Sequence, residues 1–118
     1  MSDCLFCRIG AGEIPAEVVL ETETTLAFRD ITPHARVHVL VIPREHHDSL
    51  AGLAEVDAQG AADLAVVAGQ VAQQEGIAES GYRVISNVGP DSGQEVPHVH
   101  LHVLGGERLG PLVQPAQR

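Results

Sequence analysis

Residues 98–104 read "HVHLHVL", so that His98, His100 and His102 alternate with aliphatic residues. Successive side chains of a β-strand point to opposite faces, which places the three imidazoles on one face at intervals of about 6 to 7 Å. We therefore predict a strand with one imidazole face and one aliphatic face. A lone histidine on a strand is usually a packed polar residue, but three in register beside a glycine-rich loop indicate a functional site.

Four other segments are predicted to be strands. Residues 16–30, "AEVVLETETTLAFRD", are typical of two strands joined by a polar turn near residues 21–24. The β-branched run "VHVLVIP" at residues 37–43 predicts a buried strand that ends at Pro43. "GYRVISN" at residues 81–87 predicts a further strand, and "VGPDSGQEVP" at residues 88–97 predicts a glycine-rich loop that leads into the histidine strand.

Helical segments are expected in two places. Residues 48–76 predict one long helix, because Leu64, Val67, Ala68 and Val71 recur at a spacing of three to four residues before Gly76. "CLFCRIGAGE" at residues 4–13 predicts a short helical turn. From about residue 106 the chain has no hydrophobic period and contains two prolines, which predicts an irregular tail. We expect residues 1–118 to form a single domain of the α+β class.

Length and charge limit the classes of function. A chain of 118 residues, 44% of them hydrophobic, forms a small core that gains from pairing with a second copy, so a homodimer is expected. No apolar run is long enough to cross a bilayer and no leader begins at Met1, which predicts a soluble, cytoplasmic protein. A net charge of −9 argues against a nucleic-acid polymer or an anionic membrane as partner. All seven cationic residues are arginines, which excludes lysine-based catalysis.

Cys4 and Cys7 are the two cysteines of the chain and form the motif "CLFC". Without a secretory signal, this spacing is typical of a metal clip or a redox pair rather than of a structural disulfide. A thioredoxin-type motif follows a strand, and no strand is predicted before Cys4. The sequence therefore favours metal binding.

Two metal arrangements are compatible with the histidines. In one, His98 and His100 bind a catalytic metal that keeps an open coordination position. In the other, the two cysteines and two histidines form a closed structural site. His98 is one candidate for the closed site, and "PREHH" supplies either His46 or His47. The closed site would leave His100 free.

A free His100 would face the glycine-rich loop. Gly89 and Gly93 allow backbone N–H groups to turn toward an anion, which suits phosphate binding in an acidic protein that lacks lysine. When Nδ1–H of His100 is held by an acceptor, its Nε2 atom can attack phosphorus. His102 can then donate to the phosphate oxygens.

The histidine stretch resembles the His-x-His-x-His-x-x motif, with apolar x, of the histidine triad nucleotide hydrolases and transferases. The similarity extends over most of the chain, through "LFCRIGAGEIPA", "LAFRDITPHA", "HVLVIPREH", "GYRVISNVG" and "GQEVPHVHLHVLGG". The chain looks most like the Hint branch of purine nucleoside phosphoramidases, in particular its zinc-bearing bacterial members.

The resemblance implies a dimeric α+β fold, with an antiparallel sheet of about five strands, one long helix and a short N-terminal helix. It implies that His100 is the nucleophile that forms a nucleotidyl-histidine intermediate, with His102, Asn87 and the Gly93 backbone beside the phosphate. Asp30 matches the residue that holds the ribose hydroxyls. The positions that match the base pocket are Phe6, Ile9, Phe28, Ile31 and Leu40. The positions that match the structural zinc ligands are Cys4, Cys7, His46 and His98.

The chain departs from the animal Hint proteins at two places. Glu95 stands where those proteins have a serine near the leaving group, although bacterial relatives can also carry Glu there. A second carboxylate beside the phosphate would repel anionic leaving groups and favour amines. The tail also lacks the tryptophan found near the animal C-terminus.

The function expected from the sequence is hydrolysis of nucleoside phosphoramidates or related purine mononucleotide derivatives by a zinc-containing homodimer. Dinucleoside polyphosphate hydrolysis is the alternative enzymatic activity. An alternative from another class is a nucleotide-binding or interaction module with vestigial activity.

Overall fold

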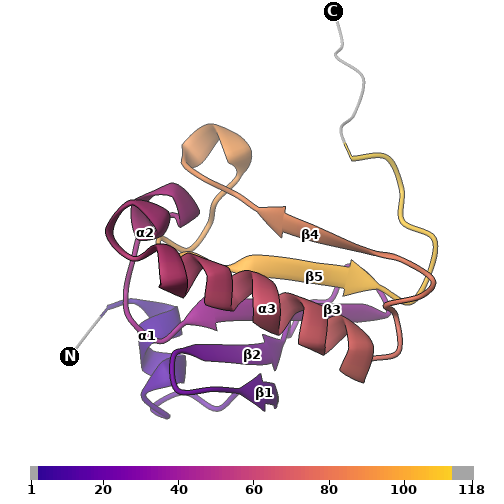
Figure 1. Cartoon of the computed structure of the whole chain (residues 1–118), viewed down its shortest axis with the longest axis horizontal. Coiled ribbons are helices and arrows are strands. Elements are labelled where there is room, and N and C mark those ends of the chain that lie inside the picture. Colours follow the sequence, from indigo (N-terminus) through magenta and orange to yellow (C-terminus); the bar gives the residue numbers. More distant parts are fainter. Residues whose placement is uncertain (1–2, 113–118) are drawn as a thin grey trace, which may run out of the picture.

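Five strands form one open antiparallel sheet in the computed structural model, which describes residues 3–112 (Figure 1). The strands are β1 (Val18–Glu21), β2 (Thr25–Arg29), β3 (Val37–Pro43), β4 (Tyr82–Ser86) and β5 (Leu101–Gly105). Their spatial order is β1-β2-β3-β5-β4, so the last strand in sequence lies between β3 and β4. The α+β class and the five predicted strands are confirmed.

The central strand β3 is buried on both faces, which explains its uninterrupted apolar sequence. Its register with β5 pairs Val39 with Val103 and Leu40 with His102. Because side chains alternate along each strand, Val39 and Val103 face one side of the sheet and Leu40 and His102 face the other. The predicted aliphatic and imidazole faces are both present.

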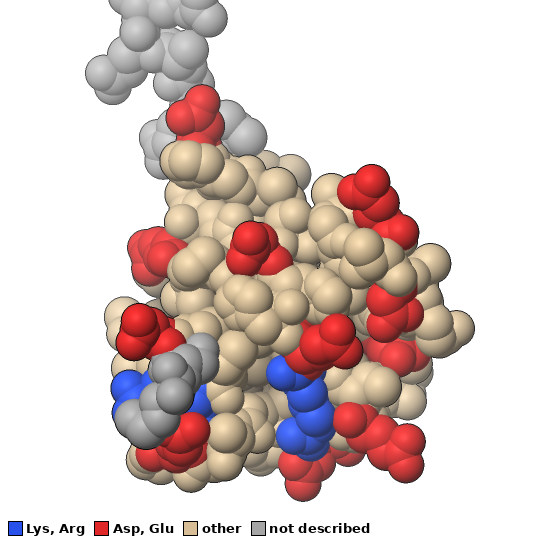
Figure 2. All heavy atoms as spheres, turned by 90° about the vertical axis from the view of Figure 1, so that its left-hand side faces the viewer, with Lys and Arg blue, Asp and Glu red and all other residues tan. Residues whose placement is uncertain are grey.

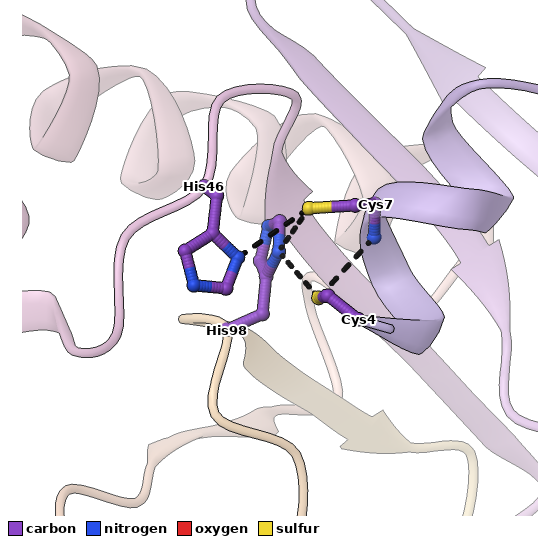
Figure 3. A group of neighbouring side chains, drawn as sticks. All are labelled: Cys4, Cys7, His46 and His98. Carbon is purple, nitrogen blue, oxygen red and sulfur yellow. Dashed lines mark hydrogen bonds between the residues drawn. The ribbon is translucent and has the colours of Figure 1, made fainter. Parts of the chain in front are cut away.

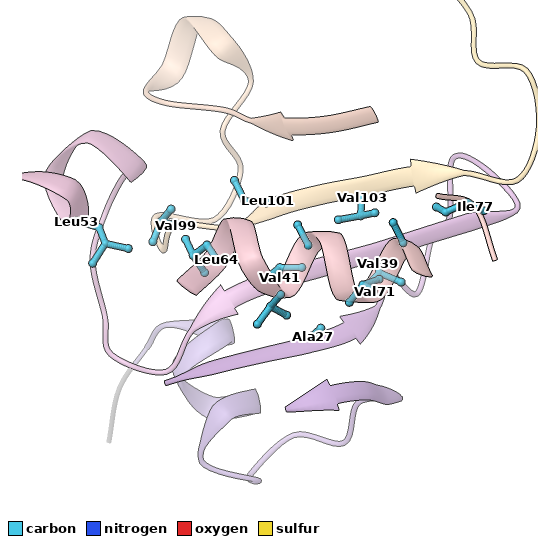
Figure 4. Packing of buried hydrophobic residues seen from close by; sticks show 13 residues of the cluster. Ala27, Val39, Val41, Leu53, Leu64, Val71, Ile77, Val99, Leu101 and Val103 are labelled. Carbon is cyan, nitrogen blue, oxygen red and sulfur yellow. The ribbon is translucent and has the colours of Figure 1, made fainter. Parts of the chain in front are cut away.

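Helix α3 (Ala58–Gln74) covers the aliphatic face of the sheet (Figure 1). Leu64, Val67 and Val71 of this helix are at most 2% exposed, which confirms the predicted spacing of its apolar residues. They pack in the main core with residues of β2, β3 and β5 (Figure 4). The residues of this core are Ala27, Val39, Val41, Leu53, Leu64, Val67, Ala68, Val71, Ala72, Ile77, Val99, Leu101 and Val103.

Helix α1 (Leu5–Gly10) covers the opposite face, the one that carries the imidazoles. Its buried residue Phe6 packs in a second cluster with four apolar residues of β2 and β3. These four residues are Leu26, Phe28, Leu40 and Ile42. Because a helix of six residues has little stability of its own, its position depends on this packing and on its cap at Cys4.

The prediction of a single long helix over residues 48–76 is wrong, because this segment forms two helices, α2 (Leu50–Val56) and α3. Asp57 separates them with a non-helical backbone (φ −152°, ψ 81°), and its carboxylate accepts a hydrogen bond from the N–H of Gly60. Ser49 caps α2 in the same way through the N–H of Gly52. Asp and Ser are preferred at N-caps, so this segment contains two helix starts.

The histidine strand is shorter than predicted. Strand β5 begins at Leu101, because the N–H of Val99 donates to the carbonyl of His47 instead of to the sheet. The alternation of side chains nevertheless continues before the strand: Val99 packs in the main core, whereas the rings of His98 and His100 contact Phe6.

The C-terminal segment that follows β5 is irregular where the structure describes it. Residues 106–112 contain no helix or strand, and the remainder of the predicted tail, residues 113–118, lies outside the described residues. None of the helices within residues 3–112 is long and apolar enough to cross a membrane.

Candidate active site and metal centre

One cavity of about 560 Å³ lies on the face of the sheet that α1 covers. All eleven residues that the sequence predicts to be catalytic or to bind substrate line it. They are Phe6, Ile9, Phe28, Asp30, Ile31, Leu40, Asn87, Gly93, Glu95, His100 and His102. The fold therefore brings together, in one cavity, residues from α1, β2, β3, β5 and the loop before the histidines.

The wall of the cavity next to α1 is apolar and aromatic. The ring centroid of Phe6 lies 5.7 Å from that of Phe28 and 5.0 Å from that of His100, both in edge-to-face geometry. Ile31, by contrast, is 96% exposed and contributes only to the rim. A flat heterocycle fits against an apolar wall of this kind.

The tautomer of His100 follows from its hydrogen bond. Nδ1 of His100 lies 2.8 Å from the carbonyl oxygen of His98. A carbonyl oxygen only accepts, so Nδ1 carries the proton and donates it. In the neutral ring the other nitrogen, Nε2, then has a free lone pair, and His100 lines the cavity with 7% of its surface exposed.

A chain of hydrogen bonds fixes the tautomer of His102. The backbone N–H of His34 donates to Nδ1 of His38, 3.1 Å away, so the proton of His38 is on Nε2. Nε2 of His38 lies 2.9 Å from Nδ1 of His102 and donates to it. Nε2 of His102 must then carry the proton of that ring, which makes it a hydrogen-bond donor.

The imidazoles of His102 and His38 are both neutral at neutral pH. Burial, followed by the nearby imidazoles of His100 and His38, lowers the pKa of His102 to about 4. Burial also lowers the pKa of His38, although the carboxylate of Asp30, 3.5 Å from Nε2 of His38, acts in the opposite direction. His38 and His102 therefore line the cavity as uncharged imidazoles.

His38 is the functional residue that sequence reasoning missed. It is 4% exposed and lines the cavity on β3, diagonal to His102 on β5. The run "VHVLVIP" predicted only a buried strand. The signal was present, however, since a histidine inside a buried strand requires a polar partner, and the histidine strand is the neighbour that supplies one.

The glycine-rich loop is held by its own hydrogen bonds. Gly89 and Gly93 have positive φ angles of 80° and 85°, which glycine adopts without strain. The N–H of Gly93 donates to the carbonyl of Pro90 at 3.0 Å, so it does not turn toward an anion as predicted. The Gln94 side chain accepts from the N–H of Gly89 and donates to the carbonyl of Asp48, and it thereby anchors the loop.

The four predicted metal ligands form a compact group beside this cavity (Figure 3). Nδ1 of His98 lies 3.3 Å from Sγ of Cys4 and 3.5 Å from Sγ of Cys7. Nδ1 of His46 lies 3.4 Å from Sγ of Cys7. Two thiolates and two imidazoles around a tetrahedral zinc ion would have sulfur and nitrogen atoms about 3.5 Å apart. The donor set and its spacing therefore fit such an ion.

Hydrogen bonds from Nε2 fix how the rings of His98 and His46 face the cysteines. Nε2 of His98 donates to the carbonyl of Pro43 at 2.9 Å, and Nε2 of His46 donates to the carboxylate of Asp48 at 3.1 Å. In both rings Nδ1 is then free to bind a metal, as is usual for metal-ligating histidines. His47 is absent from this group and lies 3.5 Å from Glu45. The structure thus selects His46 where the sequence left two candidates.

Asp30, His38 and His102 form a second group with metal-like spacing. The hydrogen bonds argue against a metal there, because Nδ1 of His38 already accepts from a backbone N–H. Binding a metal through Nε2 would require this ring to carry no proton on either nitrogen. His98, in turn, directs Nδ1 to the cysteines and not toward His100, which disfavours a catalytic metal shared by those two histidines.

The HIT domain family matches residues 11–109. A purine nucleoside phosphoramidase from Escherichia coli is 40% identical over 111 residues, which cover 94% of this chain and 93% of that protein. A 14 kDa zinc-binding protein from Zea mays is 46% identical over 111 residues, 92% of this chain and 85% of that protein.

The fold is similar to that of solved structures as well. The crystal structure of a HIT family hydrolase from Legionella pneumophila has a TM-score of 0.87 and 46% sequence identity. The match covers 92% of this chain and 96% of that one.

Proposed function

The chain belongs to the HIT domain family, and from this premise we propose that it is a hydrolase of nucleoside 5′-phosphoramidates or related purine mononucleotide derivatives. The observation that carries the proposal is the hydrogen bond from Nδ1 of His100 to the His98 carbonyl, which in the neutral ring leaves a lone pair on Nε2 of a residue that lines the cavity. A neutral imidazole nitrogen in this position is a nucleophile for phosphorus. The HIT hydrolase and the phosphoramidase among the similar proteins support the assignment.

The reaction proceeds in two displacements. Nε2 of His100 attacks the α-phosphorus, the bond from phosphorus to the amine nitrogen breaks, and the amine takes up one proton as it leaves. Water then attacks the phosphorus of the nucleotidyl-histidine intermediate. The bond to Nε2 breaks, one proton is returned to solvent and the nucleoside monophosphate is released.

Neighbouring side chains bind the nucleotide during these steps. Nε2–H of His102 donates to a phosphate oxygen, as does the amide of Asn87, which lines the same cavity. His38 positions His102 through their hydrogen bond. The aromatic wall next to α1 packs against the base, and Asp30 accepts hydrogen bonds from the ribose hydroxyls.

Turnover of defined substrates tests this proposal. Adenosine 5′-phosphoramidate of a simple amine should be hydrolysed to adenosine monophosphate, and a diadenosine polyphosphate should be a much poorer substrate. The variant His100→Asn should lose hydrolysis while it still binds adenosine monophosphate, because the binding groups remain. Faster cleavage of the diadenosine polyphosphate would favour the alternative enzyme, and binding without turnover of either compound would indicate a nucleotide-binding module.

The same assay tests the role of Asp30. Its Oδ1 accepts from the N–H of Thr32 at 2.8 Å, a bond that Asn in its place can retain. Asp30→Asn removes the charge-assisted bonds to ribose and should lower kcat/KM about tenfold for the ribonucleoside substrate. The 2′-deoxy substrate should be affected less. Equal losses on both substrates would contradict the assignment.

We also propose that Cys4, Cys7, His46 and His98 hold one structural zinc ion. With four protein ligands the site has no open position, so the ion would join the N-terminal turn to the sheet without entering the reaction. The tight ligand spacing and the zinc-binding relative from Zea mays support this.

Metal content and stability test the zinc proposal. Protein purified without chelator should contain one zinc per chain, and Cys4→Ser should lose it together with a few kcal/mol of unfolding free energy. His46→Gln should also lose zinc, whereas its matched control His47→Gln should retain it, since His47 lies outside the group. Parent protein that contains no zinc would contradict this assignment. So would loss of zinc from His47→Gln but not from His46→Gln.

A homodimer formed through β4 is proposed as the working assembly. β4 is an edge strand, and its side chains Tyr82 and Val84 are 39% and 46% exposed. Pairing of two β4 edges would satisfy their backbone groups and cover these side chains. Sedimentation equilibrium should give about twice the chain mass of 12.5 kDa, and a species of the single-chain mass at micromolar concentration would contradict the dimer.

A further inference from the structure

Glu95 places a carboxylate at the cavity without a compensating cation. It is exposed, lines the cavity with His100 and His102, and forms no ion pair with any residue in the described range 3–112. It belongs to the segment that carries Asn87 and Gly93, which also line the cavity. A charge at this position acts on whatever substrate group lies next to that segment.

Within residues 3–112, no other charged group of the cavity neutralises the negative charge of Glu95. Arg29 is the one arginine among the described lining residues, and its guanidinium is held by Glu17 at 2.7 Å and by Glu75 at 2.6 Å. Asp30 adds a second carboxylate on the ribose side. His38 accepts a hydrogen bond at Nδ1, as His102 does, and a ring nitrogen that accepts carries no proton. The cavity therefore has an excess of negative charge.

The surroundings have the same sign. The chain carries a net charge of −9, and on the end of the molecule seen in Figure 2 acidic side chains cover more surface than arginines, which lie beside acidic groups. A diffuse negative field of this kind is screened by salt, whereas a carboxylate inside a cavity mouth acts at short range. The effect of the Glu95 carboxylate on a substrate can thus be distinguished from the effect of the protein's overall negative charge.

The two sides of the cavity receive different parts of the substrate. The apolar wall formed by Phe6, Phe28 and Leu40 suits the base, and Asp30 lies beside it for the ribose. Displacement at phosphorus places the leaving group opposite the attacking Nε2 of His100 and away from the nucleoside. Of the charged lining residues that the structure describes, Arg29 is paired and Asp30 is assigned to the ribose, which leaves Glu95 as the charged side chain that a leaving group in the cavity can meet.

We propose that Glu95 selects the leaving group by charge, so that the enzyme acts on nucleoside phosphoramidates whose leaving amine bears a second, positively charged group. This inference rests on the proposed phosphoramidate hydrolysis and specifies its substrate class. A cationic group near Glu95 gains an ion pair in the cavity, whereas a carboxylate or a further phosphate meets like charge.

Three adenosine 5′-phosphoramidates of equal leaving-group length test the inference. Their amines are butylamine, 3-aminopropyl-trimethylammonium and 4-aminobutyrate, which add a neutral, a positive and a negative group. For the parent protein at low salt, kcat/KM should be about tenfold or more higher for the cationic than for the anionic compound. This ratio should fall as salt is added.

Variants assign the ratio to one side chain. Glu95→Gln should lower the ratio several-fold, and Glu95→Lys should invert it, a result that loss of structure cannot produce. The matched control Glu79→Gln changes the net charge equally at an exposed site outside the cavity and should leave the ratio unchanged. A control that lowers the ratio as much as Glu95→Gln does would assign the effect to the general field and overturn the inference.

Failure of the inference is distinguishable from failure of the proposed function. If the parent hydrolyses the butylamine compound but treats all three equally at low salt, Glu95 does not select the leaving group and the phosphoramidase proposal stands. If none of the three is hydrolysed, the phosphoramidase proposal fails and the inference fails with it.

Discussion

The antiparallel register between β3 and β5 is the constraint on which the site depends. It pairs Leu40 with His102 and Val39 with Val103, and so directs imidazoles to the α1 side and aliphatic residues to the α3 side. It also sets His38 diagonal to His102, within hydrogen-bond distance. A slip of one residue would exchange the two faces and place histidines in the main core. The hydrophobic core and the chemistry are therefore specified by the same pairing.

Hydrogen bonds to backbone carbonyls determine which nitrogen of each histidine ring donates. The carbonyl of Pro43, at the end of β3, accepts a hydrogen bond from Nε2–H of His98, and Nδ1 of this ring faces the cysteines. The carbonyl of His98 accepts a hydrogen bond from Nδ1–H of His100, which in the neutral ring leaves the lone pair on Nε2. Two adjacent histidines of the motif thus present different nitrogens. Phe6 connects the two sites, since it lies between Cys4 and Cys7 in sequence and contacts the ring of His100.

Sequence periodicity predicted the elements that depend on alternation. The imidazole face, the buried strand at residues 37–43 and the apolar stripe of α3 follow from local spacing, and the structure has all three. The break at Asp57 was missed because apolar spacing continues through it, although its capping chemistry is visible in the sequence. The role of His38 and the choice of His46 over His47 depend on pairing between distant strands and loops, which spacing within one segment does not specify. The occupied N–H of Gly93 likewise depends on the loop's own turn geometry.

The proposed reaction requires a covalent bond between Nε2 of His100 and the phosphorus of the nucleotide. Rapid quenching of the zinc-loaded parent during hydrolysis of an adenosine phosphoramidate, followed by mass spectrometry of the peptide that spans residues 98–104, measures this bond directly. We predict a transient adenylyl adduct on His100 that is lost in mild acid, as a phosphorus–nitrogen bond should be, and that is absent from His100→Asn. An adduct on another residue, or a His100→Asn protein that turns over at the parental rate, would contradict it.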